Sequence, residues 1–150
     1  MRKKEIYIIL HNIRSRYNVG SIFRTADGAG VNKIYLCGIT PCPPHSRISK
    51  VALGAENYVP WEYTKQTWRL LKKLKNEGVY IAGVELNKKS IPYYDFKPNH
   101  PLAIVLGAET TGLPSSILNR CNALVAIPMH GQKESLNVAT ATGIIAYSVI

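Results

Sequence analysis

Five short apolar segments along the chain predict β-strands. Nearly every position in each segment is apolar, so the pattern lacks the alternation of a strand with one face in water. Continuous apolar strands are typical of a parallel sheet whose two faces are both covered by helices. The predicted strands are residues 6–10, 33–39, 79–86, 102–106 and 123–128.

The segments between these strands predict helices. Val19, Ile22, Phe23 and Ala26 follow the i, i+3, i+4, i+7 spacing of one helix face, and the helix is expected to begin near Val19 and end at Gly28. Strands that alternate with helices predict an α/β three-layer sandwich with a mostly parallel sheet. Residues 1–150 are expected to form a single domain, since no linker or repeat divides them.

A second helix is predicted after residue 64. Thr64 is a plausible N-cap, and Gly78 is expected to end the helix. The residues expected to face inward are Trp68, Leu71 and Leu74, and those expected to face outward are Lys72, Lys73 and Lys75.

The last segment, residues 136–150, predicts a helix that is apolar on most of its circumference. It has no charged residue and reaches Ile150 without a polar cap, as expected of a chain cut from a longer protein. A helix of this kind must be covered on all sides, and the simplest cover is a second copy of the chain. The sequence therefore predicts a homodimer, with complete enclosure by the helix's own domain as the alternative.

The chain is strongly basic. It has 19 Lys and Arg residues against 9 Asp and Glu, a net charge of +10, which favours a polyanionic partner such as nucleic acid. The basic clusters are Arg2, Lys3 and Lys4; Arg14 and Arg16; Lys72, Lys73 and Lys75; and Lys88 with Lys89.

Several classes of site and location are not expected. No apolar run reaches the roughly 18 residues of a membrane span, and no signal peptide is present, so we expect a cytoplasmic protein. The three cysteines form no C-x-x-C pair and the four histidines are scattered, so neither a disulfide framework nor a metal site is expected. Residues 107–112 have the spacing of a phosphate loop, but Leu113 and Pro114 stand where lysine and serine are required.

Three polar sets remain as candidates for chemistry. Asn18 and Arg24 belong to the first helix, where Arg24 is expected to point into a cleft and bind phosphate, or else to be an ordinary surface arginine. In the second set a buried strand ends at Gly107 and is followed by Glu109, and this glycine would allow a ligand to approach the backbone closely. The third set contains Ser135 and Asn137, of which only one is needed to cap a helix; the other could serve a ligand.

In this order, the three sets resemble the motifs of the SpoU (TrmH) family in the SPOUT superfamily of methyltransferases. The matching segments are residues 18–26, 105–113 and 127–137, and the resemblance covers residues 11–150. It implies an α/β domain with a C-terminal trefoil knot, a family dimer packed through the knot region and the last helix, and S-adenosylmethionine as cofactor. The positions that would touch the cofactor are Leu106, Gly107, Ile127, Met129 and Leu136.

The resemblance also implies the activity, methylation of a ribose 2′-hydroxyl in RNA without a metal, with tRNA favoured over rRNA. The residues implied at the catalytic centre are Arg24, Asn18, Glu109, Ser135 and Asn137. A guanidinium stays protonated in proteins, so we expect Arg24 to hold phosphate and stabilise the forming alkoxide rather than to accept the proton.

No separate RNA-binding domain is expected, so the core itself would contact RNA phosphates, through Arg14, Arg16, Arg47 and Lys50. The competing hypotheses are a non-catalytic RNA-binding protein with the same fold and another kind of nucleotide-binding α/β enzyme.

Overall fold

The computed structural model describes residues 4–150; Arg2 and Lys3 of the first basic cluster lie outside the described residues. A single seven-stranded sheet runs through it in the order β3-β2-β1-β6-β4-β7-β5, and every strand pairing is parallel. The strands are β1 (Ile6–His11), β2 (Lys33–Cys37), β3 (Trp61–Thr64), β4 (Tyr80–Val84), β5 (Ile91–Pro92), β6 (Leu102–Gly107) and β7 (Ala123–Ala126).

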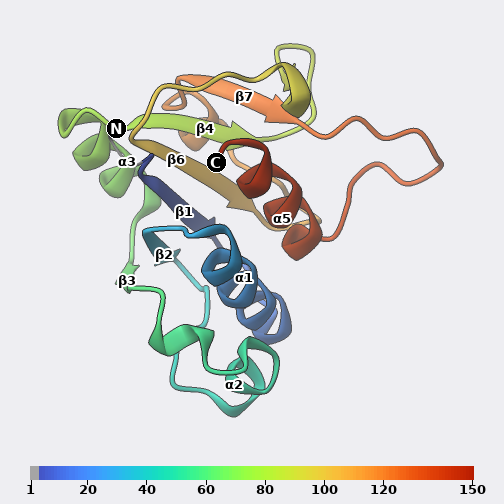
Figure 1. Cartoon of the computed structure of the whole chain (residues 1–150). Coiled ribbons are helices and arrows are strands. Elements are labelled where there is room, and N and C mark those ends of the chain that lie inside the picture. Colours follow the sequence, from blue (N-terminus) through green and yellow to red (C-terminus); the bar gives the residue numbers. More distant parts are fainter. Residues whose placement is uncertain (1–3) are drawn as a thin grey trace.

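Helices cover both faces of this sheet. The α-helices are α1 (Arg16–Ala29), α2 (Ser46–Ala52), α3 (Thr67–Asn76), α4 (Ser115–Leu118) and α5 (Val138–Ser148), and the short 3-10 helices are η1 (Ala55–Asn57) and η2 (Tyr93–Asp95). Figure 1 shows α1 and α5 packed beside one another over β1 and β6, while α3 and α4 lie on the opposite face. The predicted three-layer α/β architecture with a parallel sheet is confirmed.

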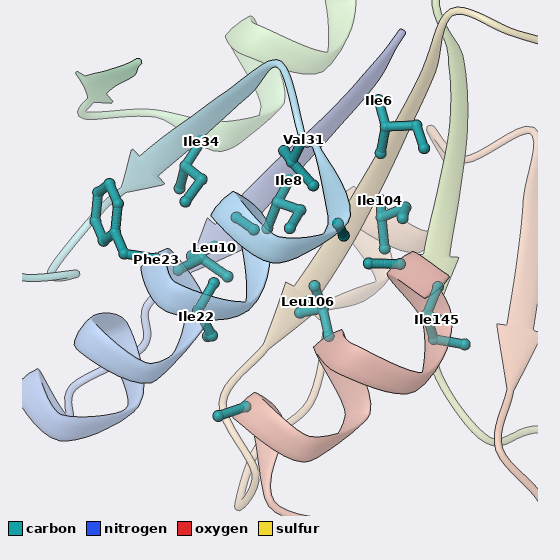
Figure 2. Packing of buried hydrophobic residues seen from close by; sticks show 14 of the residues in the cluster. Ile6, Ile8, Leu10, Ile22, Phe23, Val31, Ile34, Ile104, Leu106 and Ile145 are labelled. Atoms are coloured by element: carbon teal, nitrogen blue, oxygen red, sulfur yellow. The ribbon is translucent and has the colours of Figure 1, made fainter. Parts of the chain in front are cut away.

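The packing explains why the strand segments are apolar throughout. Along β1, Ile8 and Leu10 join the core beneath α1 and α5, whereas Ile9 joins the core beneath α3. Figure 2 shows the first of these cores, in which Phe23 and Ile145 approach the sheet from two different helices. Because successive side chains of a strand point to opposite faces, a sheet covered on both faces requires apolar residues at every position.

All five predicted strands exist, but two edge strands were missed. The segment of β3 has exposed Glu62 and Tyr63 between half-buried ends, and β5 is only two residues long. Neither forms a continuous apolar run, because an edge strand needs less burial than a central one.

The predicted second helix is confirmed with Leu71 and Leu74 inward and Lys72, Lys73 and Lys75 outward, but its N-cap and the position of Trp68 differ from the prediction. Thr64 is the last residue of β3, and α3 begins at Thr67 with Gln66 at its N-cap. Trp68 was expected to face inward but is 38% exposed, and Leu70 takes the inward position together with Leu71 and Leu74. Thr67, Leu70, Leu71 and Leu74 share one side of α3, and Trp68 lies at the flank of this side, roughly 60° beyond Leu71.

The two other predicted helices begin at different residues from those expected. Ser15 caps α1 by accepting a hydrogen bond from the Asn18 N–H at 3.1 Å, so α1 starts at Arg16 and includes Asn18. Asn137 caps α5, which runs from Val138 to Ser148 rather than across residues 136–150. Across residues 4–150, no helix has the length and apolar character to cross a membrane.

Candidate active site

A pocket of about 470 Å³ opens where β4, β6 and β7 end and α5 begins; we call it the edge pocket. Parallel strands present their carboxyl ends at one edge of the sheet, and ligands of α/β proteins bind there. The residues implied to contact a cofactor all line this pocket: Leu106, Gly107, Ile127, Met129 and Leu136. Glu109 and Ser135 line it as well, so the second and third motifs meet at one place.

Asn137 links the α5 helix to the rim of the edge pocket. Its side-chain oxygen accepts hydrogen bonds from the backbone N–H groups of Ala139 at 2.9 Å and Thr140 at 3.2 Å, which is the geometry of an N-cap. Its amide nitrogen is therefore turned away from the helix. Ser135, which lines the pocket, does not cap α5 and is the surplus polar residue of the third motif.

The amide nitrogen of Asn137 joins two other candidate residues. It donates to Oδ1 of Asn18 at 3.2 Å and lies 3.4 Å from Oε1 of Glu109. The same Glu109 oxygen accepts from the backbone N–H of Val138 at 3.1 Å, at the N-terminus of α5, where a negative charge is favoured. Three predicted catalytic residues, Asn18, Glu109 and Asn137, thus form one hydrogen-bonded group, which we call the polar cluster.

The loop after β6 folds tightly back on its own strand. A Cβ on Gly107 would lie 2.6 Å from the carbonyl oxygen of Gly112, and Gly112 itself has a φ of +64°. The backbone of the loop, rather than a ligand, therefore excludes a side chain at Gly107, which corrects the reason given for this glycine from the sequence. Glu85, which was not predicted from the sequence, accepts a hydrogen bond from the Leu113 N–H at 2.8 Å and holds the end of the loop against β4.

Glu85 had one signal in the sequence, an acidic residue next to the end of an apolar strand. It lines the edge pocket beside the loop that it anchors. Glu109 was predicted from the same pattern, an acidic residue just after the end of a strand, which in its case is β6. The pattern applies equally to Glu85 at the end of β4.

A second pocket, of about 710 Å³, lies between α1 and α2; we call it the basic pocket. All four residues expected to contact RNA phosphates line it, namely Arg14, Arg16, Arg47 and Lys50, and so does Arg24. The pocket depends on Gly20, because a Cβ there would lie 2.5 Å from the carbonyl oxygen of Ile48 in α2. The missing side chain allows α2 to pack closely on α1 and brings Arg47 and Lys50 beside Arg24.

Arg24 stands apart from the polar cluster in this chain. Asn18 and Arg24 are six residues apart on one helix, which places them roughly 120° apart around its axis. Arg24 accordingly lines the basic pocket, whereas Asn18 faces Asn137. The expectation of a cleft at Arg24 is met by the basic pocket, in which the side chain is exposed to solvent.

A third hollow, of about 660 Å³, adjoins both pockets; we call it the middle pocket. It shares Arg14 and Ser15 with the basic pocket and residues 108–111 with the edge pocket, and Asn18 lines it. One wall is formed by Asn12, a residue with a φ of +55° whose side-chain oxygen accepts from the Ile39 N–H at 3.1 Å. The three pockets therefore adjoin in the order edge, middle, basic.

His11 makes a structural contact at the edge of the sheet. His11, at the end of β1, forms a 2.7 Å hydrogen bond between its Nδ1 and Oγ1 of Thr67. Burial lowers the pKa of His11, which favours its neutral form. Among residues 4–150, no group of three or more His, Cys, Asp or Glu side chains is arranged to hold a metal ion.

Solved structures of similar fold agree with this architecture. The chain is similar to an A. aeolicus TrmH/SpoU tRNA modifying enzyme at 29% identity and a TM-score of 0.87, over 98% of this chain and 74% of that one. It is also similar to an AdoMet-bound rRNA methyltransferase from Sinorhizobium meliloti at 29% identity and a TM-score of 0.89, over 97% of this chain and 56% of that one.

Comparison of sequences points the same way. The chain is 35% identical to the 23S rRNA (guanosine-2′-O-)-methyltransferase RlmB of Shewanella oneidensis over 143 residues, which is 95% of this chain and 58% of the relative. The chain thus spans less than two thirds of the length of the curated relatives that it matches. The model of the SpoU rRNA Methylase family matches residues 5–147, almost the whole chain, and the protein belongs to that family.

Proposed function

We propose that the chain transfers a methyl group from S-adenosylmethionine to a ribose 2′-hydroxyl of RNA. The observation that carries this proposal is the meeting of the second and third motifs at the edge pocket, with the polar cluster at its rim. Membership of the SpoU family supports it, as do a relative named as a guanosine 2′-O-methyltransferase and a similar structure described as AdoMet-bound.

The residues of the edge pocket suit this cofactor. A volume of about 470 Å³ falls within the usual range of small-molecule sites, roughly 300–1,000 Å³. Apolar side chains of Leu106, Ile127 and Leu136 can cover the purine ring of the cofactor. The carboxylates of Glu85 and Glu109 are favourable neighbours for its positive charge. When bound, S-adenosylmethionine supplies an activated methyl group on a positively charged sulfur.

The chain's own residues would then align the substrate and manage charge. Asn137 holds Asn18 and Glu109 in fixed positions beside the edge pocket. Arg24, in the basic pocket with Arg14, would bind a substrate phosphate. Because this pocket is separate from the edge pocket, the geometry within one chain does not support the expected stabilisation of the forming alkoxide by Arg24. The hydroxyl proton would pass to a phosphate oxygen or to water, since a guanidinium remains protonated.

The decisive experiment measures cofactor binding and methyl transfer separately. S-adenosylmethionine should raise the melting temperature of the protein, and methyl groups should appear on RNA as ribose 2′-O-methylation. Arg24→Ala should abolish transfer but retain the thermal shift, while Lys97→Ala, an exposed lysine outside the three pockets, should behave as wild type. RNA binding without any cofactor-dependent shift would instead indicate a non-catalytic RNA-binding protein.

We further propose tRNA as the preferred substrate over rRNA. The relatives support both classes, since one similar structure is a tRNA modifying enzyme and the RlmB relative is named for 23S rRNA. The basic pocket is the region of the core that would grip either RNA. Equal masses of purified tRNA and rRNA offered in one assay, followed by mapping of the methylated nucleotide, distinguish the two; faster labelling of rRNA would reject the preference.

We also propose that the chain forms a homodimer through α5. Its own domain buries much of the helix, but Tyr147 remains 53% exposed and Ile150 51% exposed, and Ile144 is half-buried. These apolar side chains near the end of the chain would form the seam between two copies. Sedimentation at low micromolar concentration should give twice the chain mass, and a single 16.7 kDa species would reject the dimer.

The trefoil knot and the cytoplasmic location also remain proposals. Support for the knot comes from the family and from the way the loop of residues 108–112 and the start of α5 are joined through Glu109. A crystal structure would establish the knot if its backbone path could not be straightened by drawing the two ends apart without the chain passing through itself. Microscopy of the tagged protein in its native cell would test the location.

A further inference from the structure

The outward side of α3 carries a concentration of positive charge on the opposite face of the sheet from α1 and α5. A shallow hollow of about 540 Å³ there is lined by Trp68, Arg69, Lys72, Lys73, Asn76 and Glu77. Arg120, just beyond α4, reaches the same place, because its guanidinium lies over the Trp68 ring. We call the surface formed by Trp68, Arg69, Lys72, Lys73 and Arg120 the α3 face.

Trp68 organises two of these charges. The guanidinium carbon of Arg69 lies 5.3 Å from the centroid of the Trp68 ring, and that of Arg120 lies 5.5 Å from it. Arg120 is fixed further by a 2.8 Å hydrogen bond from its Nη1 to the carbonyl oxygen of Ser116. A guanidinium that rests on an aromatic ring keeps N–H groups at its edge free for an anion, so the two arginines are already held in place for one.

Acidic side chains neutralise only part of the α3 face: the pKa of Glu62 is lowered chiefly by its hydrogen bond from Lys33, and the nearby charge of Lys73 contributes. In the described part of the chain, residues 4–150, the one ion pair within 4.0 Å joins Lys33 to Glu62. Glu77 is the only acidic residue that lines the hollow, against three basic ones there and Arg120 beside it. An exposed tryptophan surrounded by arginine and lysine is a combination typical of surfaces that bind the backbone of a single-stranded nucleic acid.

The α3 face is continuous with the edge of the sheet where the middle pocket lies. Thr67, the first residue of α3, is hydrogen-bonded through its hydroxyl to Nδ1 of His11 at the end of β1. The next residue, Asn12, lines the middle pocket. Trp68 directly follows Thr67, so a strand that leaves the middle pocket across this edge would meet the α3 face first at Trp68.

We propose that the α3 face binds the phosphate backbone of the RNA segment that flanks the target nucleotide. The proposal rests on the proposed function for its direction, since it assumes that the target nucleotide lies at the middle and edge pockets. It extends that function by adding a second RNA-contacting surface on the other side of the sheet. Arg69 and Arg120 supply fixed phosphate contacts, and Lys72 and Lys73 supply mobile ones.

The test measures binding of a fluorescently labelled oligouridylate of about 12 nucleotides, a length that can cover both surfaces. One variant removes three charges from the α3 face, Arg69→Gln, Lys72→Gln and Arg120→Gln. The matched control removes three exposed lysines elsewhere, Lys88→Gln, Lys89→Gln and Lys97→Gln. Dissociation constants are determined by fluorescence anisotropy over a range of salt concentrations, and melting temperatures confirm that both variants fold.

The α3-face variant should bind at least about tenfold more weakly than the control at 0.1 M salt. Its salt dependence should fall by about 2 in the slope of log K against log salt, roughly 0.7 for each single-strand phosphate that the variant no longer neutralises. Trp68→Ala, which keeps every charge but removes the support of two of them, should show an intermediate loss. Equal affinities of the α3-face variant and the control, or no binding of the oligonucleotide by the wild-type protein, would overturn the proposal.

The same variants keep the two proposals distinguishable. If the proposed activity holds, the α3-face variant should raise the KM for RNA and leave the rate at saturating RNA unchanged, with the thermal shift by S-adenosylmethionine intact. If methyl transfer and the thermal shift are absent from the wild-type protein, the proposed function fails, and the anisotropy comparison still decides whether the α3 face binds RNA.

Discussion

Replacement of Asn137 should separate the stability of α5 from the function of the polar cluster. The side chain has two roles: its oxygen caps α5 through Ala139 and Thr140, and its nitrogen holds Asn18 and Glu109. Asn137→Ala removes both roles. Asn137→Ser keeps a short hydroxyl oxygen for the cap but has no amide that can reach the two partners together.

The expected cost of Asn137→Ala follows from the cap. Loss of an N-cap side chain lowers the free energy of unfolding by about 1 kcal/mol, which corresponds to a fall of roughly 2–4 °C in melting temperature for a chain of this size. Ala139 is nearly buried, so its released N–H regains little from water and the loss should not be smaller than this. Asn137→Ser should stay within about 0.5 kcal/mol of the wild type, because serine is a good cap.

Urea titration and calorimetry measure the stability, and methyl transfer to RNA measures the polar cluster. We expect Asn137→Ala to lose both and Asn137→Ser to lose only transfer. Equal stability of the wild type and Asn137→Ala would refute the capping argument. Full transfer by Asn137→Ser would show that the link between Asn18 and Glu109 is not needed for the reaction.

Three further changes test the packing and the charge of the core. Gly107→Ala should destabilise the protein by about 1–3 kcal/mol in urea titration, because its Cβ would lie 2.6 Å from the Gly112 carbonyl oxygen. Gly131→Ala is the matched control, since a Cβ there meets nothing within 4 Å, and an equal loss in both variants would contradict the steric reason. Leu71→Ala, at a fully buried position on the inner side of α3, should cost about 2–5 kcal/mol by the same measurement, and a loss below about 1 kcal/mol would mean that the α3 core is loosely packed. Because burial lowers the pKa of His11 in the folded state, the unfolded chain binds more protons; stability should be complete above the unfolded pKa of about 6.5 and decline as the pH falls below it. Calorimetry at pH 7.5 and pH 5.5 should therefore show a smaller decrease for His11→Gln than for the wild type, and identical decreases would exclude a contribution from His11.

The sequence was sufficient for the centre of the fold and insufficient for its periphery. Central strands such as β1 and β6 are covered on both faces, so burial imposes a continuous apolar pattern that can be recognised without a structure. At the edge, β3 needs only partial burial, and α2 is too short to display a helical period. Trp68 shows the same limit, because an apolar residue on a helix does not reveal whether it packs inward or supports charged neighbours at the surface.

The candidate site could be predicted as a set of residues but not as a geometry. Its second and third motifs converge because the parallel strands that precede them, β6 and β7, end at one edge of the sheet. The contact between Asn18 and Asn137 joins residues 119 positions apart, and no spacing rule in the sequence anticipates it. Glu85 was missed because the predicted strand, residues 79–86, included it, whereas β4 ends at Val84.

The first motif illustrates how a short stretch of sequence can serve three separate places. Asn18 belongs to the polar cluster, Gly20 allows α2 to pack closely, and Arg24 lines the basic pocket that this packing creates. Their separation around a single helix explains why Arg24 does not meet Asn18 although the motif joins them in sequence. The motif therefore combines residues from different sides of α1. One side of the helix faces the polar cluster, and another presents the positive charge expected to hold RNA.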